Sequence, residues 1–249
     1  MKILISNDDG IFARGLEILE EVCRDVGSVT VVAPDREQSA ASNSLTISRP
    51  LRVVDRGGGR FQVDGTPTDC VLLALDTIMP EPPNFVISGI NHGTNMGEDV
   101  LYSGTVAAAM EGLSLGIPGM ALSSAGGDAD VMDSQRDWIH RLVANVVAVE
   151  DFPRETLLNV NLPRVPGPEV KGIRVTKLGR RFYSESLRKM KDPWGQDIYW
   201  IGAGKGNWSG GEDSDFRAVA DGYISVTPLH VDLTRYDSLE LVRSWNLDA

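Results

Sequence analysis

Two short apolar runs near the N-terminus, with a helical pattern between them, constrain the fold most. Residues 3–6 read Ile-Leu-Ile-Ser and residues 28–33 read Ser-Val-Thr-Val-Val-Ala, and such aliphatic and β-branched runs are typical of buried strands. Residues 15–26 place apolar side chains three and four positions apart, which predicts an amphipathic helix. A strand–helix–strand unit of about 30 residues indicates parallel strands joined by a right-handed crossover, and therefore an α/β fold.

This alternation continues along the chain and then stops. Further strands are expected at residues 85–88, 119–123 and 157–161, with helices at 66–78, 105–115 and 131–149 and a hairpin at 51–63. Beyond the prolines of 163–168, strand-like runs occur at 173–177, 198–201 and 223–227, with a short helix near 238–245. We expect a mostly parallel sheet flanked by helices over residues 1–165. A β-rich extension over residues 166–249, packed with that core or separate from it, is expected to serve oligomerisation.

The charge balance and the two cysteines limit the partners and the compartment. The 249 residues include 24 Lys and Arg against 35 Asp and Glu, giving a net charge of −11 and a pI near 4.7. A nucleic-acid-binding face needs clustered basic residues, so no polymeric nucleic acid is expected as a partner. Cys23 and Cys70 lie in apolar contexts, which favours buried, reduced thiols. With no leader sequence and no apolar run long enough for a membrane helix, the protein is expected to be cytoplasmic.

Two adjacent carboxylates follow the first predicted strand. Residues 7–10 read Asn-Asp-Asp-Gly, so Asp8 and Asp9 lie at the carboxyl end of that strand, where α/β sheets bind ligands. Two ionised carboxylates side by side repel one another unless a proton or a cation lies between them. Mg²⁺, Mn²⁺ and Ca²⁺ all take oxygen ligands, so the pair indicates a site for a divalent metal. The alternative is an ordinary turn with solvated acids.

Two more polar segments follow predicted strands and are expected to meet Asp8 and Asp9 above the sheet. They are residues 35–43 and residues 88–97. The second contains Asn91, whose amide oxygen suits a hard cation. It also contains His92, which is either a general acid near neutral pH or a solvated loop residue.

The helix expected at residues 105–115 opens with a possible phosphate site. Ser103, Gly104 and Thr105 precede its first turn, and a helix N-terminus offers free backbone N–H groups and a partial positive charge to an anion. Alternatively, Thr105 serves only as a helix cap.

Several separate motifs, in the same order, make the chain similar to the SurE family, the stationary-phase survival proteins with 5′-nucleotidase activity. The similarity runs almost from end to end. The motifs that carry it are Ser-Asn-Asp-Asp-Gly at 6–10, Ala-Pro-Asp-Arg at 33–36 with Ser39 and Ser-Asn-Ser at 42–44, Gly-Thr-Pro-Thr-Asp-Cys at 65–70, Ser-Gly-Ile-Asn at 88–91, Tyr-Ser-Gly-Thr-Val at 102–106, Gly-Tyr at 222–223 and Thr-Pro-Leu at 227–229.

The resemblance implies a metal-dependent phosphomonoesterase that hydrolyses nucleoside 5′-monophosphates, in some members also 3′-nucleotides or short polyphosphate. It implies a Rossmann-like core, a homodimer or homotetramer built through the extension, and one divalent cation per subunit (Mg²⁺, Mn²⁺ or Ca²⁺). Carried over by motif, the catalytic pair is Asp8 and Asp9, and the metal ligands are Asp8, Asp9, Ser39 and Asn91. The phosphate contacts carried over are Asn95, Ser103, Gly104 and Thr105.

Two residues depart from the family pattern. Arg14 stands where proline is common, and His92 stands where a small or amide residue is usual. Neither removes an implied ligand, but both are expected to be able to alter substrate preference.

Three alternatives to the metal-dependent phosphatase remain at this point. A covalent aspartyl-phosphate route is one, although the adjacent acids are not the spaced Asp-x-Asp pair of that chemistry. The others are a metal-dependent nucleotide sensor without turnover, and a glycosyltransferase whose acids hold a metal–diphosphate.

Overall fold

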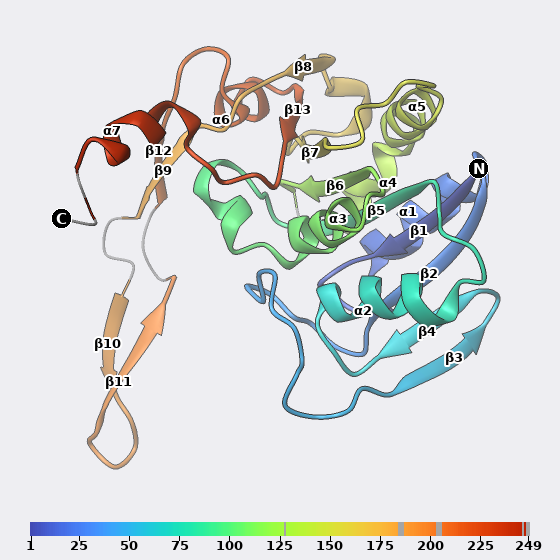
Figure 1. Cartoon of the computed structure of the whole chain (residues 1–249), viewed down its shortest axis with the longest axis horizontal. Helices are drawn as coiled ribbons and strands as arrows, with labels where there is room; N and C mark the ends of the chain where they lie inside the picture. The colour runs from blue at the N-terminus through green and yellow to red at the C-terminus, as the bar shows by residue number, and fades with distance from the viewer. Residues whose placement is uncertain (127, 184–186, 203–205, 246, 248–249) are drawn as a thin grey trace.

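The protein is built around a nine-stranded, mostly parallel sheet (Figure 1). The computed structural model describes residues 1–126, 128–183, 187–202, 206–245 and 247. Within them the strand order of the sheet is β3-β4-β2-β1-β5-β6-β7-β13-β8. The strands are β1 (Lys2–Ser6), β2 (Ser28–Pro34), β3 (Val53–Gly57), β4 (Arg60–Val63), β5 (Phe85–His92), β6 (Gly119–Ser124), β7 (Leu157–Leu162), β8 (Ile173–Val175) and β13 (Ile224–Leu229).

Successive strands are added first on one side of β1 and then, from β5 onward, on its other side. From β1 it first moves outward through β2 to β4, and it then returns to β5 and continues to β6 and β7. All of these strands are parallel, with Ser6 of β1 opposite Ser88 of β5. In such sheets the crevice beyond the carboxyl ends of the two diverging strands is the usual ligand site. The expected α/β fold with a Rossmann-like sheet is confirmed.

Helices cover both faces of the sheet because its strands alternate their buried side chains. Ile3 and Ile5 belong to the core under α1 (Arg14–Arg24), α4 (Ala129–Ser134) and α5 (Arg136–Val147). Leu4 points the other way, into the core under α2 (Pro67–Leu73) and α3 (Gly104–Ser114). The hydrophobic core therefore lies on both faces of β1, and the polar residues that follow β1 lie beyond its carboxyl end.

The expected C-terminal extension contains more structure than its sequence pattern suggested. Two of its strands, β13 and β8, join the main sheet beside β7. Its other strands form small antiparallel pairs, and the pair β10–β11 projects from the body (Figure 1). The remaining elements are β9 (Arg180–Tyr183), β10 (Leu187–Lys191), β11 (Asp197–Ile201), β12 (Gly206–Ser209), α6 (Asp215–Ala220) and α7 (Leu239–Arg243). The boundary at residue 165 stays a prediction.

Short helical segments complete the chain, and one helix start was anticipated from its residues. Thr66 and Asp69 form a reciprocal capping box at α2, with Pro67 in the first turn. The short segments are η1 (Ala74–Ile78), η2 (Gly97–Leu101), η3 (Gly167–Glu169) and η4 (Tyr236–Ser238).

The helix expected at residues 131–149 is wrong as a single element. It divides into α4 and α5 at Gln135, which is fully buried. The Gln135 amide donates to the carbonyls of Pro163 and Val165, at 2.9 and 2.7 Å. Because the loop after β7 packs against this point, contacts from a distant segment decide where the helix breaks.

The two cysteines and the helix lengths bear on two further expectations from the sequence. Cys23 and Cys70 are buried free thiols, and burial raises the pKa of both, that of Cys23 to about 12, so both are poor nucleophiles. Among the described residues, no helix has the length and apolar character needed to cross a membrane.

Candidate active site

The candidate site lies beyond the carboxyl ends of β1 and β5, the neighbouring strands at which the strand order changes direction. Asp8 and Asp9 follow β1, Asn91 lies at the end of β5, and the first turn of α3 faces them. One open cavity of 680 Å³ is bordered by five of the residues implied by the resemblance. They are Asp8, Ser39, Asn91, Asn95 and Ser103. Residues from three separate strand ends therefore meet, as expected from the sequence.

Asp8 is the most deeply buried acid of this site, with 4% of its surface exposed. Its Oδ1 accepts a hydrogen bond from the Thr105 hydroxyl on α3. Burial raises the pKa of Asp8 to about 6, and the charge of Asp9 adds to the rise, while the Thr105 hydrogen bond opposes it. The site therefore holds a carboxylate whose charge lacks full compensation from the protein.

Asp9 is half-buried and faces the end of β5. Its Oδ2 accepts the backbone N–H of His92 at 3.1 Å. Burial raises the pKa of Asp9 and Glu37 raises it further, whereas His92 lowers it. Glu37 thus brings a third carboxylate close to the pair, and the sequence argument did not identify it.

Ser39 is exposed on the loop after β2, and this loop is tied to Asp8. The N–H of Gln38 donates to the Asp8 carbonyl at 2.7 Å. The Ser39 hydroxyl donates to Glu37 Oε1 at 2.6 Å, so its oxygen retains lone pairs toward the cavity. The hydroxyl borders the same cavity as Asp8, although it does not contact either aspartate side chain here.

Asn91 and Asn95 have different surroundings. The Asn91 amide nitrogen donates to the Gly93 carbonyl at 2.8 Å. Asn95 is buried, and its amide nitrogen donates to Ser123 Oγ at 2.8 Å. Its backbone N–H and carbonyl are held by the side chain of Asn161, at 2.9 and 3.0 Å. Asn95 is therefore fixed at the edge of the cavity by strands β6 and β7.

The first turn of α3 packs closely against Asp8. Ser103 caps the helix by accepting the Val106 N–H at 3.0 Å. Gly104 allows the approach, because a Cβ there would lie 2.7 Å from the Cβ of Asp8. The alternative role of Thr105 as the helix cap is wrong, because Ser103 is the cap; Thr105 is fully buried and its hydroxyl donates to Asp8. The N-terminus of α3 thus packs against Asp8, the buried member of the carboxylate pair.

A second, smaller hollow of 330 Å³ lies on the other side of His92. Asp9, Phe12, Asp35 and Glu37 border it, and Arg36 at its rim is paired with Asp35 at 2.9 Å. His92 borders both hollows through its exposed side chain. The acids of the smaller hollow make it unfavourable for a phosphate group.

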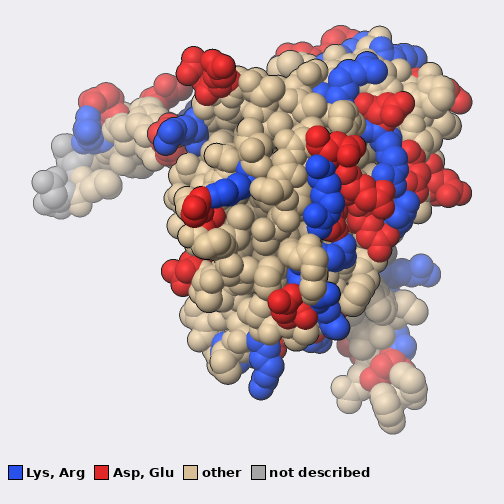
Figure 2. Space-filling view, turned by 90° about the vertical axis from the view of Figure 1, so that its right-hand side faces the viewer, with Lys and Arg blue, Asp and Glu red and all other residues tan. Residues whose placement is uncertain are grey.

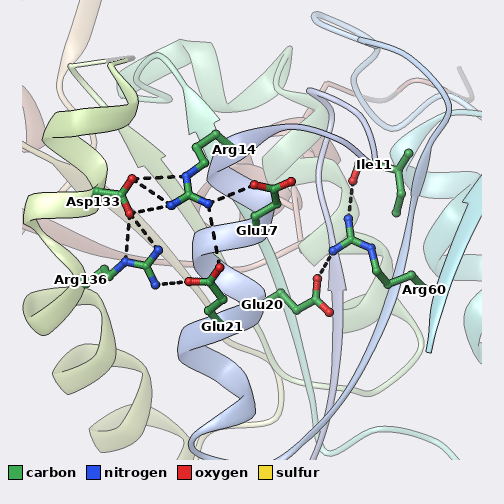
Figure 3. A network of polar contacts seen from close by, with 8 residues as sticks. All are labelled: Ile11, Arg14, Glu17, Glu20, Glu21, Arg60, Asp133 and Arg136. Atoms are coloured by element: carbon green, nitrogen blue, oxygen red, sulfur yellow. Dashed lines mark hydrogen bonds and ion pairs between the residues drawn. The ribbon is translucent and has the colours of Figure 1, made fainter. Parts of the chain in front are cut away.

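Arg14, one of the two departures from the family pattern, is engaged away from these hollows (Figure 3). Its guanidinium contacts Glu17 at 3.1 Å and Asp133 at 3.0 Å, and Arg136 binds the same Asp133 at 2.8 Å. Figure 2 shows acidic and basic side chains interleaved in a band on the side of the molecule that lies to the right in Figure 1. The network ties α1 to α4 and α5, and any effect of Arg14 on substrate preference stays a prediction.

The cavity also has walls that sequence reasoning missed. Tyr102 lies one residue before the cap of α3, and Arg181 and Ile201 come from β9 and β11 of the extension. The Arg181 guanidinium is paired with Asp99, which also borders the cavity. The Tyr102 position stood within a recognised motif, but no local pattern links residues 181 and 201 to this site.

The oxygen atoms available as metal ligands at this site fit a hard divalent cation. No hydrogen-bond donor among the described residues reaches Asp9 Oδ1 or Asn91 Oδ1, so both oxygens are available to a ligand. Throughout the part of the chain that the structure describes, there is no cluster of three or more His, Cys, Asp or Glu side chains suited to a metal. A cation here would rely on two carboxylates and neutral oxygens, the ligands that Mg²⁺, Mn²⁺ and Ca²⁺ accept.

Comparisons with known proteins agree with this arrangement. Residues 3–185 match the family model described as Survival protein SurE. A protein of Gemmatimonas aurantiaca named 5′-nucleotidase SurE is 61% identical, with 98% of each chain covered. One of the same name from Vibrio cholerae is 48% identical over 98% of this chain and 97% of its own. The crystal structure of SurE protein from Aquifex aeolicus matches with a TM-score of 0.88 and 43% identity, covering 98% of this chain and 99% of its own. The chain belongs to the SurE family.

Proposed function

We propose that this protein is a metal-dependent phosphomonoesterase that hydrolyses nucleoside 5′-monophosphates to nucleoside and phosphate. One observation carries the proposal: Asp8, beside its acidic neighbour Asp9 beyond the carboxyl end of β1, packs against the N-terminus of α3 and borders one open cavity together with Ser103. The relatives named 5′-nucleotidase SurE support the nucleotide as substrate. Some 3′-nucleotides and short polyphosphate are proposed as further substrates, because they present the same phosphate group.

Asp8 and Asp9 would hold one divalent cation per subunit, with Asn91 and Ser39 as neutral oxygen ligands. When bound, the cation supplies positive charge to the phosphate and lowers the pKa of a coordinated water. The raised pKa of Asp8 supports this assignment, because a buried carboxylate with an acidic neighbour is stabilised by a nearby cation. Mg²⁺, Mn²⁺ and Ca²⁺ all suit these ligands.

The chain's own groups would orient the phosphate and stabilise its charge. Gly104 and Thr105 place the first turn of α3, with its backbone N–H donors, beside Asp8, and the Thr105 N–H interacts with the Asp8 carboxylate. Such donors, fixed before the reaction, stabilise negative charge that develops in a transition state. Ser103 and Asn95 border the same cavity and are proposed as further phosphate contacts. Thr105 keeps Asp8 in place through its hydroxyl.

We also propose that the extension assembles the protein into a homodimer or homotetramer. The projecting β10–β11 hairpin exposes large apolar side chains, including Trp194 at 84% and Trp200 at 62%. A two-stranded ribbon is only marginally stable by itself in water. Burial of these side chains against another subunit would remove an exposed apolar surface.

A panel of nucleoside monophosphates with Mg²⁺, Mn²⁺ and Ca²⁺ tests the enzymatic proposal. We expect phosphate release from AMP that EDTA abolishes, and that Asp8→Asn reduces on the order of 100-fold or more, as when a group that stabilises transition-state charge is removed. Asp35→Asn is the matched control, because it removes a carboxylate at the same sheet edge that is paired with Arg36. Binding of AMP without phosphate release would instead support a nucleotide sensor.

A further inference from the structure

The cavity beside Asp8 is bordered by an aromatic residue that the proposed phosphate chemistry does not use. Tyr102 borders this cavity, and its side chain is exposed, with 64% of the residue surface accessible. No aromatic stacking or cation–π contact involves its ring among the residues that the structure describes. An aromatic ring at the wall of a polar site is a suitable surface for a flat ligand group.

The backbone of Tyr102 is held although its ring is exposed. Its carbonyl accepts the N–H of Ser42 at 3.2 Å, and its N–H donates to the backbone carbonyl of Asp99 at 3.0 Å. The next residue, Ser103, is the cap of α3. The backbone that carries the ring is therefore held from both sides, on one side by the loop that carries Ser39 and on the other by the helix that packs against Asp8.

The shape of the cavity places the ring beside the phosphate position. The same space reaches from Asp8 and Ser103 to Tyr102, and Ile201 adds an apolar wall. Its volume of 680 Å³ lies within the range of about 300–1,000 Å³ typical of small-molecule sites. A phosphate at the start of α3 would leave its nucleoside in this space, over the residue that precedes the helix.

The smaller hollow beside Asp9 offers a rival ring, Phe12. Phe12 is similarly exposed, at 68%, but the guanidinium of Arg56 already lies 5.7 Å from its ring centroid. That hollow has about half the volume and contains Asp35 and Glu37, which disfavour an anionic ligand. The larger cavity is therefore the better nucleoside site.

We propose that Tyr102 is the residue that binds the nucleoside, by stacking its ring on the base of the bound nucleotide. This inference rests on the proposed function and deepens it, because it assigns the part of the substrate that distinguishes a nucleotide from other phosphate monoesters. Stacking uses the flat face that every base has, so Tyr102 favours nucleotides over baseless sugar phosphates.

The test compares AMP with ribose 5-phosphate, which has the same 5′-phosphate ester and no base. Removing a base-stacking ring costs roughly tenfold in binding. We therefore expect Tyr102→Ala to lower kcat/KM for AMP roughly tenfold more than for ribose 5-phosphate, mainly through KM. Tyr102→Phe keeps the ring and should restore the wild-type ratio. Phe12→Ala, the matched control, should leave the ratio unchanged.

Three outcomes would overturn the proposal. They are an equal loss for both substrates in Tyr102→Ala, no loss for AMP, and a base-dependent loss in Phe12→Ala. If the wild type releases no phosphate from either substrate, the proposed function fails separately. Stacking is then decided by equilibrium binding of AMP in the presence of Mn²⁺, which Tyr102→Ala should weaken roughly tenfold and Phe12→Ala should leave unchanged.

Discussion

At the scale of single residues, the surroundings of Asp8 explain most of the candidate site. This carboxyl group is buried against α3, next to a second acid, and its pKa is raised from 3.8 to about 6. Its position could be predicted from the sequence, because two acids after a buried strand are easy to recognise. Its closeness to Thr105 could not, since that contact depends on how α3 packs against the strand ends.

The raised pKa of Asp8 predicts a pH dependence of stability in the metal-free protein. A raised carboxyl pKa means that the folded state binds the proton more tightly, so its destabilisation is full above pH 6 and disappears below about pH 4. The effect amounts to about 3 kcal/mol. Urea unfolding in EDTA should show wild type losing that much stability relative to Asp8→Asn between pH 4 and pH 7. A difference independent of pH would contradict the assignment.

Gly104 gives a second prediction at this scale. In Gly104→Ala the new Cβ would meet the Asp8 Cβ at 2.7 Å, so the helix start and the carboxylate must separate. Small misplacements of reacting groups can cost on the order of 100-fold in rate. We expect kcat/KM for AMP to fall on the order of 10- to 100-fold with the fold retained. Ser114→Ala, at the other end of α3, is the control, and equal activity of both variants would refute the prediction.

At the scale of secondary structure elements, the sequence predicted those strands and helices whose pattern is local. It placed β1, α1, β2, α3 and β7 within a few residues, because continuous apolar runs mark the buried strands and helical spacing of apolar residues marks the helices. It ended β5 at residue 88, whereas pairing of Asn91 with Ser123 of β6 extends the strand to His92. Glycine and asparagine have low strand propensity, so only the tertiary pairing identifies this extension.

The break at Gln135 leads to a prediction of stability. Gln135→Leu removes the donor to two carbonyls, one buried and one partly buried, and each lost partner costs about 1–3 kcal/mol. Chemical denaturation should therefore show a loss of roughly 2–5 kcal/mol. Asn145→Leu on the exposed face of α5 should change stability by less than about 0.5 kcal/mol. Similar losses in the two variants would mean that the Gln135 hydrogen bonds do not hold the break.

At the scale of the whole molecule, the extension reaches from the main sheet to the candidate site. Its strands β8 and β13 extend the main sheet, and Arg181 and Ile201 border the cavity. The sequence pattern predicted a β-rich extension. It predicted neither the helix α6 nor the extension residues that border the cavity. Both follow from contacts between segments that lie far apart in the chain, which periodicity does not report. The acidic net charge remains consistent with a small-molecule substrate.

The proposed assembly predicts that a single charge on the hairpin changes the oligomeric state. Trp200→Glu would place a charge in a surface that another subunit buries, so light scattering after gel filtration should show a smaller species than the wild-type dimer or tetramer. Leu72→Glu, at a partly exposed apolar position on α2, should leave the mass unchanged. A wild-type monomer, or an unchanged mass for Trp200→Glu, would contradict the proposal.

The central claim is that one divalent cation binds between Asp8 and Asp9, opposite the start of α3. Anomalous scattering from a crystal soaked in Mn²⁺ tests it most directly, because the signal locates the metal without assumptions about the chemistry. The account predicts one strong peak in contact with both carboxylates and the Asn91 amide oxygen. A manganese peak elsewhere, with none beside Asp8 and Asp9, would contradict it.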